Sequence, residues 1–339
     1  MRIGKILSAA AACAVLATGV AACGSDDNGG SSGDSKLKVA MVLPGPINDK
    51  GFNQSGYDGL KQCEADGAEI NYQEKTPVPD FEKAFETLAQ SNDMVIGHGF
   101  EFGEIAHKVA PDFPDTDFVV TSNPLEPEDS NVQHLMPNST QGAYLAGVAA
   151  GKTTTSNKLG GIAGFDFPVL EQQMKAVEAG AQSVNPKATL ETVYLGTFDD
   201  VAKGKEAARS QAASGVDVIY HIADAAGVGV IDGAEEEGIK AIGWGVDQSA
   251  LAPKTIIASQ LVDQAKMISD SCQEAIDGKW KGGLVVDGLQ SGLVDLTPVK
   301  NAPAGTQEAV DKARAAIIDG SAEVPSIGGT IPGSGEGSN

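Results

Sequence analysis

Short apolar runs alternate with segments of helical spacing along the chain from Lys36 onward. The first segments are a strand pattern over 37–43, a helix pattern over 52–64, a strand pattern over 69–72 and a helix pattern over 80–90. Parallel strands need long crossover connections, and helices usually supply them. This β-α-β-α order predicts an α/β fold in which parallel sheets are covered by helices on both faces.

The same alternation continues through two further stretches of the chain. Strands over 93–96 and 118–120 and a helix over 101–110 complete the first series. A long apolar helix over 139–152 leads into a second series, with strands at 159–163, 192–195, 216–222 and 239–242 and helices at 168–183, 200–214 and 227–237. The third stretch holds strands at 255–259, 284–286 and 293–296 and helices at 261–278 and 305–320.

This length of folded chain, about 300 residues, exceeds the usual size of a single core. We therefore expect two Rossmann-like lobes, with the third stretch recrossing between them. The N-terminal lobe is expected from residues 37–140 plus 250–295, and the C-terminal lobe from 141–249 plus 296–325. Ligands of open α/β sheets bind beyond the carboxyl ends of the strands. Two lobes that face each other at those ends would form a cleft that can close.

The N-terminal segment is typical of an export signal. Two basic residues precede a short apolar stretch, and small residues then lead into Cys23. We expect residues 1–22 to be a signal peptide, because the apolar stretch is too short for a reliable membrane span. The sequence Val20-Ala21-Ala22-Cys23 resembles a lipobox, with Val20 where the usual pattern has Leu, and it predicts lipidation of Cys23. The alternative is an ordinary signal peptide with an accidental cysteine.

Two polar segments flank the predicted folded body. Residues 24–35 contain no apolar side chain, so we expect a flexible tether over 23–36 and a disordered tail over 326–339. An anchor followed by a tether predicts a protein held at the extracytoplasmic face of the cell membrane.

The charge of the chain disfavours polyanionic partners. Without Arg2 and Lys5, its 24 basic residues fall to 22, against 46 acidic ones. Such an acidic body repels nucleic acid and anionic lipid. The simplest interpretation of the acidic residues is that they solvate the surface. We expect no nucleic-acid partner.

Two cysteines, Cys63 and Cys272, remain outside the signal segment and the predicted lipid site. They can pair in an oxidising compartment, but separate buried thiols are the interpretation that we favour from the sequence. The four histidines lack metal-ligand spacing, so no metal site is expected.

Two glycine-rich motifs resemble nucleotide-binding loops only superficially. In residues 147–153 (GVAAGKT) the glycines are one residue too close for a P-loop, and we interpret the motif as a helix C-terminus with a glycine stop. Residues 227–233 (GVGVIDG) are one residue too long for the dinucleotide fingerprint, although a helix N-terminus there could line a cleft. Because no catalytic motif is present either, we expect no cofactor and no enzymatic activity.

The carboxyl ends of the predicted strands carry the candidate site. Each end places an aromatic ring beside a carboxylate or an amide, a combination that suits a polar ring compound. The alternative is that each Phe caps the core and each Asp caps a helix. The candidate ligand-binding residues are Asp49, Phe52, Asn53, Phe100, Glu101, Asp166, Tyr220, His221, Asp224, Gly227, Trp244 and Asp247.

Several of these strand ends resemble one known family. The segment Asn48-Asp49-Lys50-Gly51-Phe52-Asn53-Gln54 is similar to the signature of the basic membrane protein (PnrA-like) family of substrate-binding lipoproteins. Supporting similarity lies in 99–102 (GFEF), 144–147 (YLAG), 196–200 (GTFDD) and 246–248 (VDQ). The resemblance implies a type I periplasmic-binding-protein fold with three hinge crossings. It also implies a purine-nucleoside-like ligand and ABC permease and ATPase subunits as partners, and we expect a monomer.

The resemblance further implies roles for single residues. Phe52 matches a ring that stacks on the purine, with Tyr220, His221 or Trp244 opposite. Asp49 and Asn53 match polar neighbours of that ring, and Asp247 matches the acid that holds the ribose hydroxyls.

Three departures from the family pattern put recognition of ribose in doubt. They are Asp224 in a turn that is usually glycine-rich, Trp244-Gly245 in place of Val-Asp, and Val262 near the position of a ligand-contacting lysine. A free base or another polar ring compound is therefore an alternative ligand. A sensor that signals to a membrane partner is an alternative function.

Overall fold

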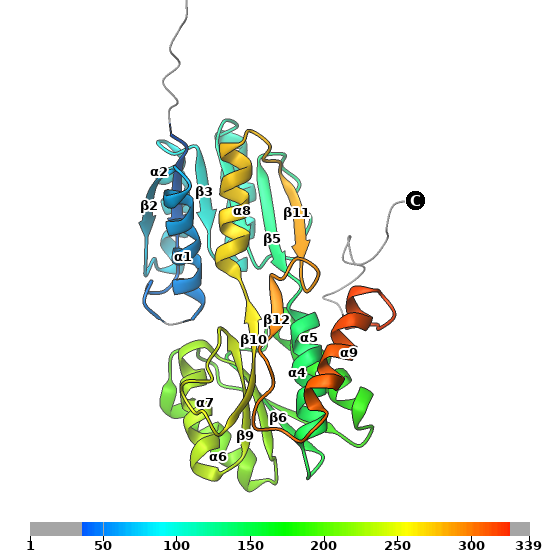
Figure 1. Cartoon of the computed structure of the whole chain (residues 1–339). Coiled ribbons are helices and arrows are strands. Elements are labelled where there is room, and N and C mark those ends of the chain that lie inside the picture. Colours follow the sequence, from blue (N-terminus) through cyan, green and yellow to red (C-terminus); the bar gives the residue numbers. More distant parts are fainter. Residues whose placement is uncertain (1–35, 50, 326–339) are drawn as a thin grey trace, which may run out of the picture. The chain divides into compact units, whose positions relative to one another are not determined.

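The computed structural model describes residues 36–49 and 51–325. The predicted signal peptide, Cys23, most of the tether, Lys50 and the C-terminal tail lie outside the described residues. The described chain contains two six-stranded sheets with helices on both faces (Figure 1).

The first sheet is entirely parallel and has the order β11-β5-β4-β3-β1-β2. Its strands are β1 (Lys38–Val42), β2 (Glu69–Gln73), β3 (Met94–Gly97), β4 (Asp117–Thr121), β5 (Val132–Pro137) and β11 (Gly283–Asp287). Alternate residues of β1 enter different cores, with Val39 and Met41 on one face and Ala40 and Val42 on the other. This double burial explains why β1 is an unbroken apolar run.

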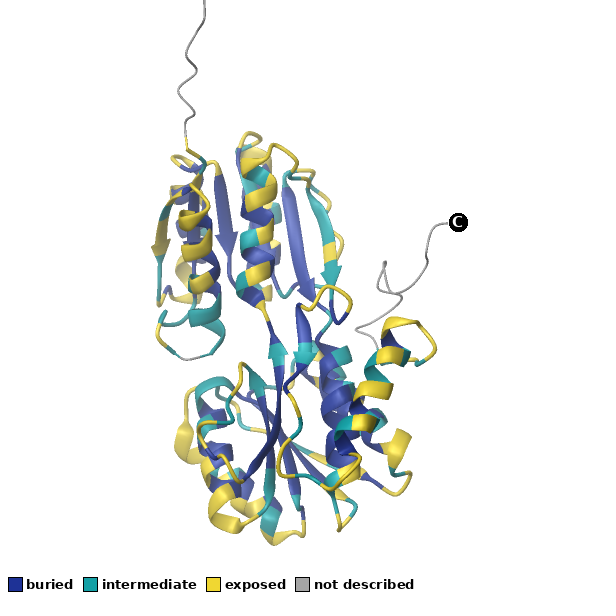
Figure 2. Ribbon diagram, viewed as in Figure 1, coloured by how far each residue is buried: buried dark blue, intermediate teal, exposed yellow. Residues whose placement is uncertain are grey.

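Two pairs of helices cover the first sheet. One face packs against α1 (Phe52–Ala65) and α8 (Gln264–Ile276). The other packs against α2 (Phe81–Ala89) and α3 (Gly103–Val109), which are flanked by the short 3₁₀ helices η1 (Val78–Asp80), η2 (Phe100–Phe102) and η3 (Ala110–Asp112). Figure 2 shows the resulting buried strands between helices with exposed outer faces.

The second sheet has the order β12-β10-β9-β8-β6-β7, and it is parallel except for β12. Its strands are β6 (Lys158–Ala163), β7 (Thr189–Tyr194), β8 (Val218–Ile222), β9 (Lys240–Gly245), β10 (Ile256–Val262) and β12 (Val294–Leu296). One face carries α4 (Ser139–Thr153), α5 (Pro168–Val184) and α9 (Thr306–Ile318). The other carries α6 (Val201–Ala213) and α7 (Asp224–Glu237).

The chain passes between the two sheets three times, after β5, after β10 and between β11 and β12. The number of crossings confirms the expected fold, but the expected boundary near residue 250 differs from the sheet membership. β10 continues to Val262 because Gln260 and Leu261 still pair with Trp244 and Gly245 of β9. Residues 256–262, and Val294 and Asp295 at the start of β12, therefore belong to the second sheet.

The motif at 147–153 lies within α4, as its interpretation as part of a helix requires, but the helix does not stop at a glycine. It continues to Thr153, and Gly147 and Gly151 instead face α5, where a Cβ atom would collide with the carbonyl oxygens of Val177 and Ala181. The glycines thus allow two helices to pack closely.

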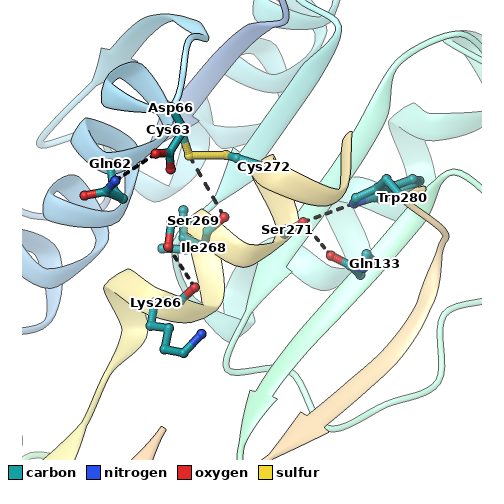
Figure 3. Close-up of a disulfide and its surroundings, with 10 residues drawn as sticks. All are labelled: Gln62, Cys63, Asp66, Gln133, Lys266, Ile268, Ser269, Ser271, Cys272 and Trp280. Atoms are coloured by element: carbon teal, nitrogen blue, oxygen red, sulfur yellow. Dashed lines mark hydrogen bonds between the residues drawn. A yellow bond between two sulfur atoms is a disulfide. The ribbon is translucent and has the colours of Figure 1, made fainter. Parts of the chain in front are cut away.

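A disulfide joins α1 to α8 on one face of the first sheet (Figure 3). It links Cys63 to Cys272, whose Cα atoms are 5.7 Å apart, across a sequence separation of 209 residues. The preference for separate thiols was therefore wrong. Both cysteines are buried where the helices meet, and the sequence does not reveal that proximity.

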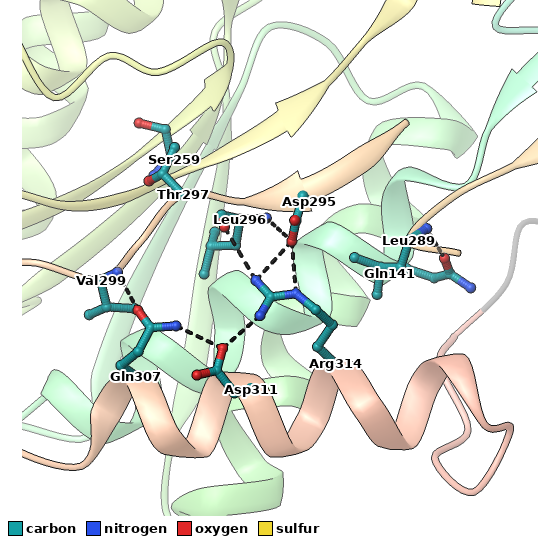
Figure 4. A network of polar contacts seen from close by, with 10 residues as sticks. All are labelled: Gln141, Ser259, Leu289, Asp295, Leu296, Thr297, Val299, Gln307, Asp311 and Arg314. Carbon is teal, nitrogen blue, oxygen red and sulfur yellow. Dashed lines mark hydrogen bonds and ion pairs between the residues drawn. The ribbon is translucent and has the colours of Figure 1, made fainter. Parts of the chain in front are cut away.

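The last helix is attached to β12 by a polar network (Figure 4). Arg314 of α9 donates to Asp295 over 2.9 Å and pairs with Asp311 one turn earlier at 2.6 Å. The same guanidinium donates to the carbonyl oxygen of Leu296 over 3.3 Å. These contacts hold the helix beside the strand that follows the third crossing.

Candidate ligand-binding site

A cavity of about 550 Å³ is lined by residues of both sheets and their connections. Its lining comes mainly from segments at the carboxyl ends of strands, as expected for this class of fold. The aromatic residues that line it are Phe52, Phe100, Phe165, Phe167, Phe198 and Trp244. The carboxylates are Asp49, Glu101, Asp199 and Asp224.

Phe52 begins α1 and is held from behind by His98. The two rings are stacked, with centroids 3.9 Å apart and an interplanar angle of 17°. His98 Nε2 lies 2.8 Å from the carbonyl oxygen of Phe52, and Nδ1 lies 3.0 Å from the hydroxyl of Thr121. A carbonyl oxygen only accepts, so Nε2 carries the proton and Nδ1 accepts from Thr121. Burial lowers the pKa of His98 to about 4, which keeps this supporting ring neutral.

Asp49 and Asn53 line the cavity, but their polar atoms are engaged within the loop. Asp49 accepts hydrogen bonds from the backbone N–H groups of Gly51, Asn53 and Gln54 at 2.9 to 3.0 Å. It thereby caps the start of α1 from three residues before the first helical residue. The side-chain amide of Asn53 donates to Asp49 over 2.8 Å and accepts from the backbone of Gly45 over 2.9 Å. The described residues of segment 48–54 therefore form the loop that holds Phe52 at the cavity.

A group of phenylalanines in mutual contact also lines the cavity. Phe165 stacks on Phe167 with centroids 5.2 Å apart, and Phe198 meets Phe165 edge-on at 5.1 Å. Phe167, just before α5, also meets Phe100, which follows β3, edge-on at 5.1 Å. This last contact joins segments that follow strands of different sheets.

Trp244 lies at the end of β9 and is oriented by a buried amide network. Its indole N–H donates to Gln173 Oε1 over 3.3 Å, and the same oxygen accepts from Gln260 Nε2 over 3.2 Å. Gln260 in turn accepts from the hydroxyl of Tyr220 over 2.6 Å and donates to the carbonyl oxygen of Ser139 over 3.0 Å. The network connects the indole to the first crossing, where Ser139 begins α4.

Asp224 begins α7 and carries the most perturbed carboxyl group of the cavity. Burial raises its pKa to about 7, with further contributions from the negative charges of Asp49 and Asp199. A Cβ atom on Gly51 would lie 3.5 Å from Asp224 Oδ1, so the carboxyl group lies close to the N-terminus of α1. Burial also raises the pKa of Glu101.

The cavity brings together seven of the twelve candidate residues. They are Asp49, Phe52, Asn53, Phe100, Glu101, Asp224 and Trp244.

The other five candidates lie away from the cavity lining. Tyr220 and His221 are central residues of β8, and their side chains are buried against Gln260 and Gln248 rather than exposed at its end. Gly227 lies inside α7, which begins at Asp224, and it packs against the ring of His221.

Asp166 and Asp247 point to solvent from turns. In the sequence, Asp166 lies between Phe165 and Phe167, whose rings stack on each other. Asp247 follows Gly245, whose φ of 85° turns the chain, and its carboxylate accepts from the backbone of Ser249 over 2.9 Å. This geometry therefore does not support Asp247 as the acid that holds the ribose hydroxyls.

Several residues that line the cavity were not predicted from the sequence, and neither was the residue that supports the ring of Phe52. Phe165 and Phe167 flank the candidate Asp166, and Phe198 lies in the family-like segment 196–200, so their aromatic character was the available signal. Gln173 and Gln264 lie in helices, and His98 lies behind Phe52. No local pattern marks these three positions.

Two parallel α/β units, joined by three crossings around an aromatic-lined cavity, define a solute-binding protein of the type I periplasmic fold. A family model described as "ABC transporter substrate-binding protein PnrA-like" matches residues 36–327, so the chain belongs to this Bmp family. It is 32% identical to the ABC transporter nucleoside-binding protein BmpA of Lactococcus lactis subsp. cremoris, over 91% of this chain and 95% of that protein.

Solved structures share the fold. An ABC transporter solute-binding protein from Aeropyrum pernix K1 superposes with a TM-score of 0.74 at 22% identity, covering 84% of this chain and 92% of that one. One from Conexibacter woesei gives 0.69 at 26% identity, covering 86% and 99%. Membership of this family implies an extracytoplasmic location. Across the part of the chain that the structure describes, no helix is long and apolar enough to span a membrane.

Proposed function

We propose that this protein is the binding subunit of an ABC importer and that it captures a purine nucleoside or a related heterocycle. The observation that carries the proposal is the cavity itself, where six aromatic rings stand beside four carboxylates at the carboxyl ends of the strands. Flat apolar faces and directional acceptors suit a ring that bears amino, ring N–H or hydroxyl groups. The nucleoside-binding relative supports the same ligand class.

In this proposal the ligand ring lies between Phe52 and Trp244. Both residues line the main cavity and also a narrow crevice beside it. His98 supports Phe52 from behind, and Gln173 fixes the indole. Glu101 and Asp224 accept hydrogen bonds from the ligand, while Asp49 and Asn53 hold the loop in shape. Closure of the two lobes around the ligand would then be the signal that the permease and ATPase subunits use.

Calorimetry on the purified protein tests the ligand class directly. Adenosine, guanosine and inosine should bind with affinities that ribose alone does not reach, because ribose lacks the stacking ring. Native mass spectrometry of the protein as purified should show a bound molecule of the same class. If none of the nucleosides or their free bases binds, and the co-purified molecule has no aromatic ring, the proposed ligand class is wrong.

We also propose that Cys23 becomes the lipidated N-terminus after removal of residues 1–22. The support is the small residues before Cys23 and the membership of a transporter-associated family. Expression in a bacterial host with labelled fatty acid should label the wild-type protein and leave Cys23→Ala unlabelled. Equal labelling of both proteins would contradict the assignment.

A further inference from the structure

Gln264 is the first residue of α8 and follows the second crossing between the sheets directly. Its side chain lines the main cavity and the crevice that Phe52 and Trp244 share, yet only 4% of the residue is exposed. Its Nε2 atom donates to the hydroxyl of Ser122 over 3.3 Å. Its Oε1 atom is buried and has no hydrogen-bond partner among the described residues.

A buried acceptor without a partner is costly, so native proteins rarely leave one. Other buried glutamines of this chain show the usual arrangement. Gln133 accepts from Ser271 and donates to the carbonyl oxygen of Lys281 (Figure 3 shows the first contact). Gln260 is likewise bonded at both amide atoms. Gln211 Oε1 also lacks a partner within the described chain, but it lies on α6, away from the cavity.

We propose that Gln264 Oε1 accepts a hydrogen bond from the ligand and thereby selects ligands that carry a donor at that edge. This inference rests on the proposed function, since it takes the ligand to be a ring held between Phe52 and Trp244. The shared crevice places the amide beside both rings. A donor on the edge of the ring, an amino group, a ring N–H or a ribose hydroxyl, supplies the bond that the protein lacks.

The position of Gln264 gives this contact a second consequence. α8 packs on the first sheet, whereas Trp244 and Asp224 belong to the second sheet and its connections. A ligand that bonds to Gln264 and stacks on Trp244 therefore joins both units beside a crossing. Gln264 is a specificity-determining residue that also favours closure.

Donor-deleted ligands and a Gln264→Leu variant test the assignment together. The parent ligand is adenosine. Purine riboside lacks its amino group, and 2′-deoxyadenosine and 3′-deoxyadenosine each lack one hydroxyl. In the wild-type protein, one of these deletions should weaken binding roughly 10- to 100-fold, because it leaves Oε1 unpaired. In Gln264→Leu, the same deletion should weaken binding by less than about 2-fold.

Gln133→Leu is the matched control, because it removes a buried and fully bonded glutamine from a site away from the cavity. This control should keep the wild-type discrimination even where its stability falls. Circular dichroism checks that each variant is folded, and Gln264→Met replaces Gln264→Leu if the branched side chain prevents folding.

The outcomes separate the inference from the proposed function. If the wild-type protein binds adenosine and every deletion costs the same in the Gln264 variants, the assignment of Gln264 is overturned while the ligand class stands. If the wild-type protein binds none of the four compounds, the proposed nucleoside function fails. The role of Gln264 is then tested by native mass spectrometry, which shows whether each variant still retains the co-purified molecule. Loss from the Gln264 variants with retention in Gln133→Leu supports the assignment, and retention in all of them overturns it.

Discussion

Asp224 provides a direct test of the electrostatics of the cavity. Its folded-state pKa is about 7, against an ordinary value of 3.8, because burial and the charges of Asp49 and Asp199 disfavour the carboxylate. The folded protein therefore binds more protons than the unfolded chain between these two pKa values, and stability falls as the pH rises through that window. The loss is complete above about pH 7. At about 1.4 kcal/mol per pKa unit, a shift of about three units corresponds to at most about 4 kcal/mol.

Asparagine is the replacement that isolates this charge. Asp224 has a φ of 43°, and Asn is one of the few residues that tolerate the left-handed region. Asp224→Asn should therefore keep the start of α7 while removing the penalty of ionisation. At pH 8 the melting temperature of the ligand-free variant should exceed that of the wild-type protein by several degrees, up to about 10 °C. At pH 5, roughly one unit above the ordinary pKa of 3.8, the difference should shrink to less than half of its value at pH 8.

The measurement is differential scanning calorimetry from pH 5 to pH 8, with Asp166→Asn as the matched control. Asp166 is exposed and outside the cavity lining, so its replacement should leave the pH dependence of the wild-type protein unchanged. Asp117, with a pKa of about 6, contributes the same pH dependence of stability in every protein compared. Its contribution therefore cancels in the difference. If Asp224→Asn and the wild-type protein keep the same melting-temperature difference at pH 5 and pH 8, the reasoning on Asp224 is refuted.

Four further predictions concern the rings, the charge of the ligand, the histidines and the disulfide. Phe52→Ala should weaken adenosine binding roughly 100-fold in calorimetry, because burial and stacking of a ring contribute a few kcal/mol, and Phe113→Ala, remote from the cavity, should not. Adenosine monophosphate should bind much more weakly than adenosine, because the described lining offers Lys75 as its one cation beside four carboxylates; equal affinities would contradict this. Burial lowers the pKa of both His98 and His221 to about 4, so stability present above pH 6.5 should be lost as the pH falls towards 4, as acid melting curves would show. The Cys63→Ser, Cys272→Ser double variant should lose roughly 2–5 kcal/mol in urea unfolding yet bind adenosine normally, because the disulfide lies between α1 and α8 and outside the cavity lining.

The sequence predicted the fold well because apolar periodicity reports local burial, and parallel sheets bury their strands on both faces. It missed β5, where Gln133 and His134 interrupt the apolar pattern. Both residues are almost fully buried, because Gln133 bonds to Ser271 and Lys281 while His134 bonds to the carbonyl oxygen of Leu125. The partners of Gln133 lie more than a hundred residues away in the sequence, so they leave no trace in a local window.

The site could be predicted only as far as the strand ends define it. Phe52, Phe100 and Trp244 were found because an aromatic residue at the end of a parallel strand faces the cleft. Tyr220 was placed wrongly although the end of its strand at Ile222 was predicted correctly, because its phenol is buried inside the sheet against Gln260. A correctly predicted strand end therefore does not settle whether a nearby ring faces the cavity or the core, because that depends on packing against residues far away in the sequence.

In the proposed site, the family motif and the ligand selectivity are assigned to different residues. Asp49 and Asn53 use their polar atoms on the backbone and on each other, so in this arrangement they fix the position of Phe52 and offer little to a ligand. Selection among rings must then come from groups whose hydrogen-bonding capacity remains open. Asp224, Glu101 and Gln264 fit that description, and they reach the cavity from α7, η2 and α8. Relatives that keep the Asp49–Asn53 loop and differ at these three positions should therefore bind rings in the same stacked position while preferring different polar substituents.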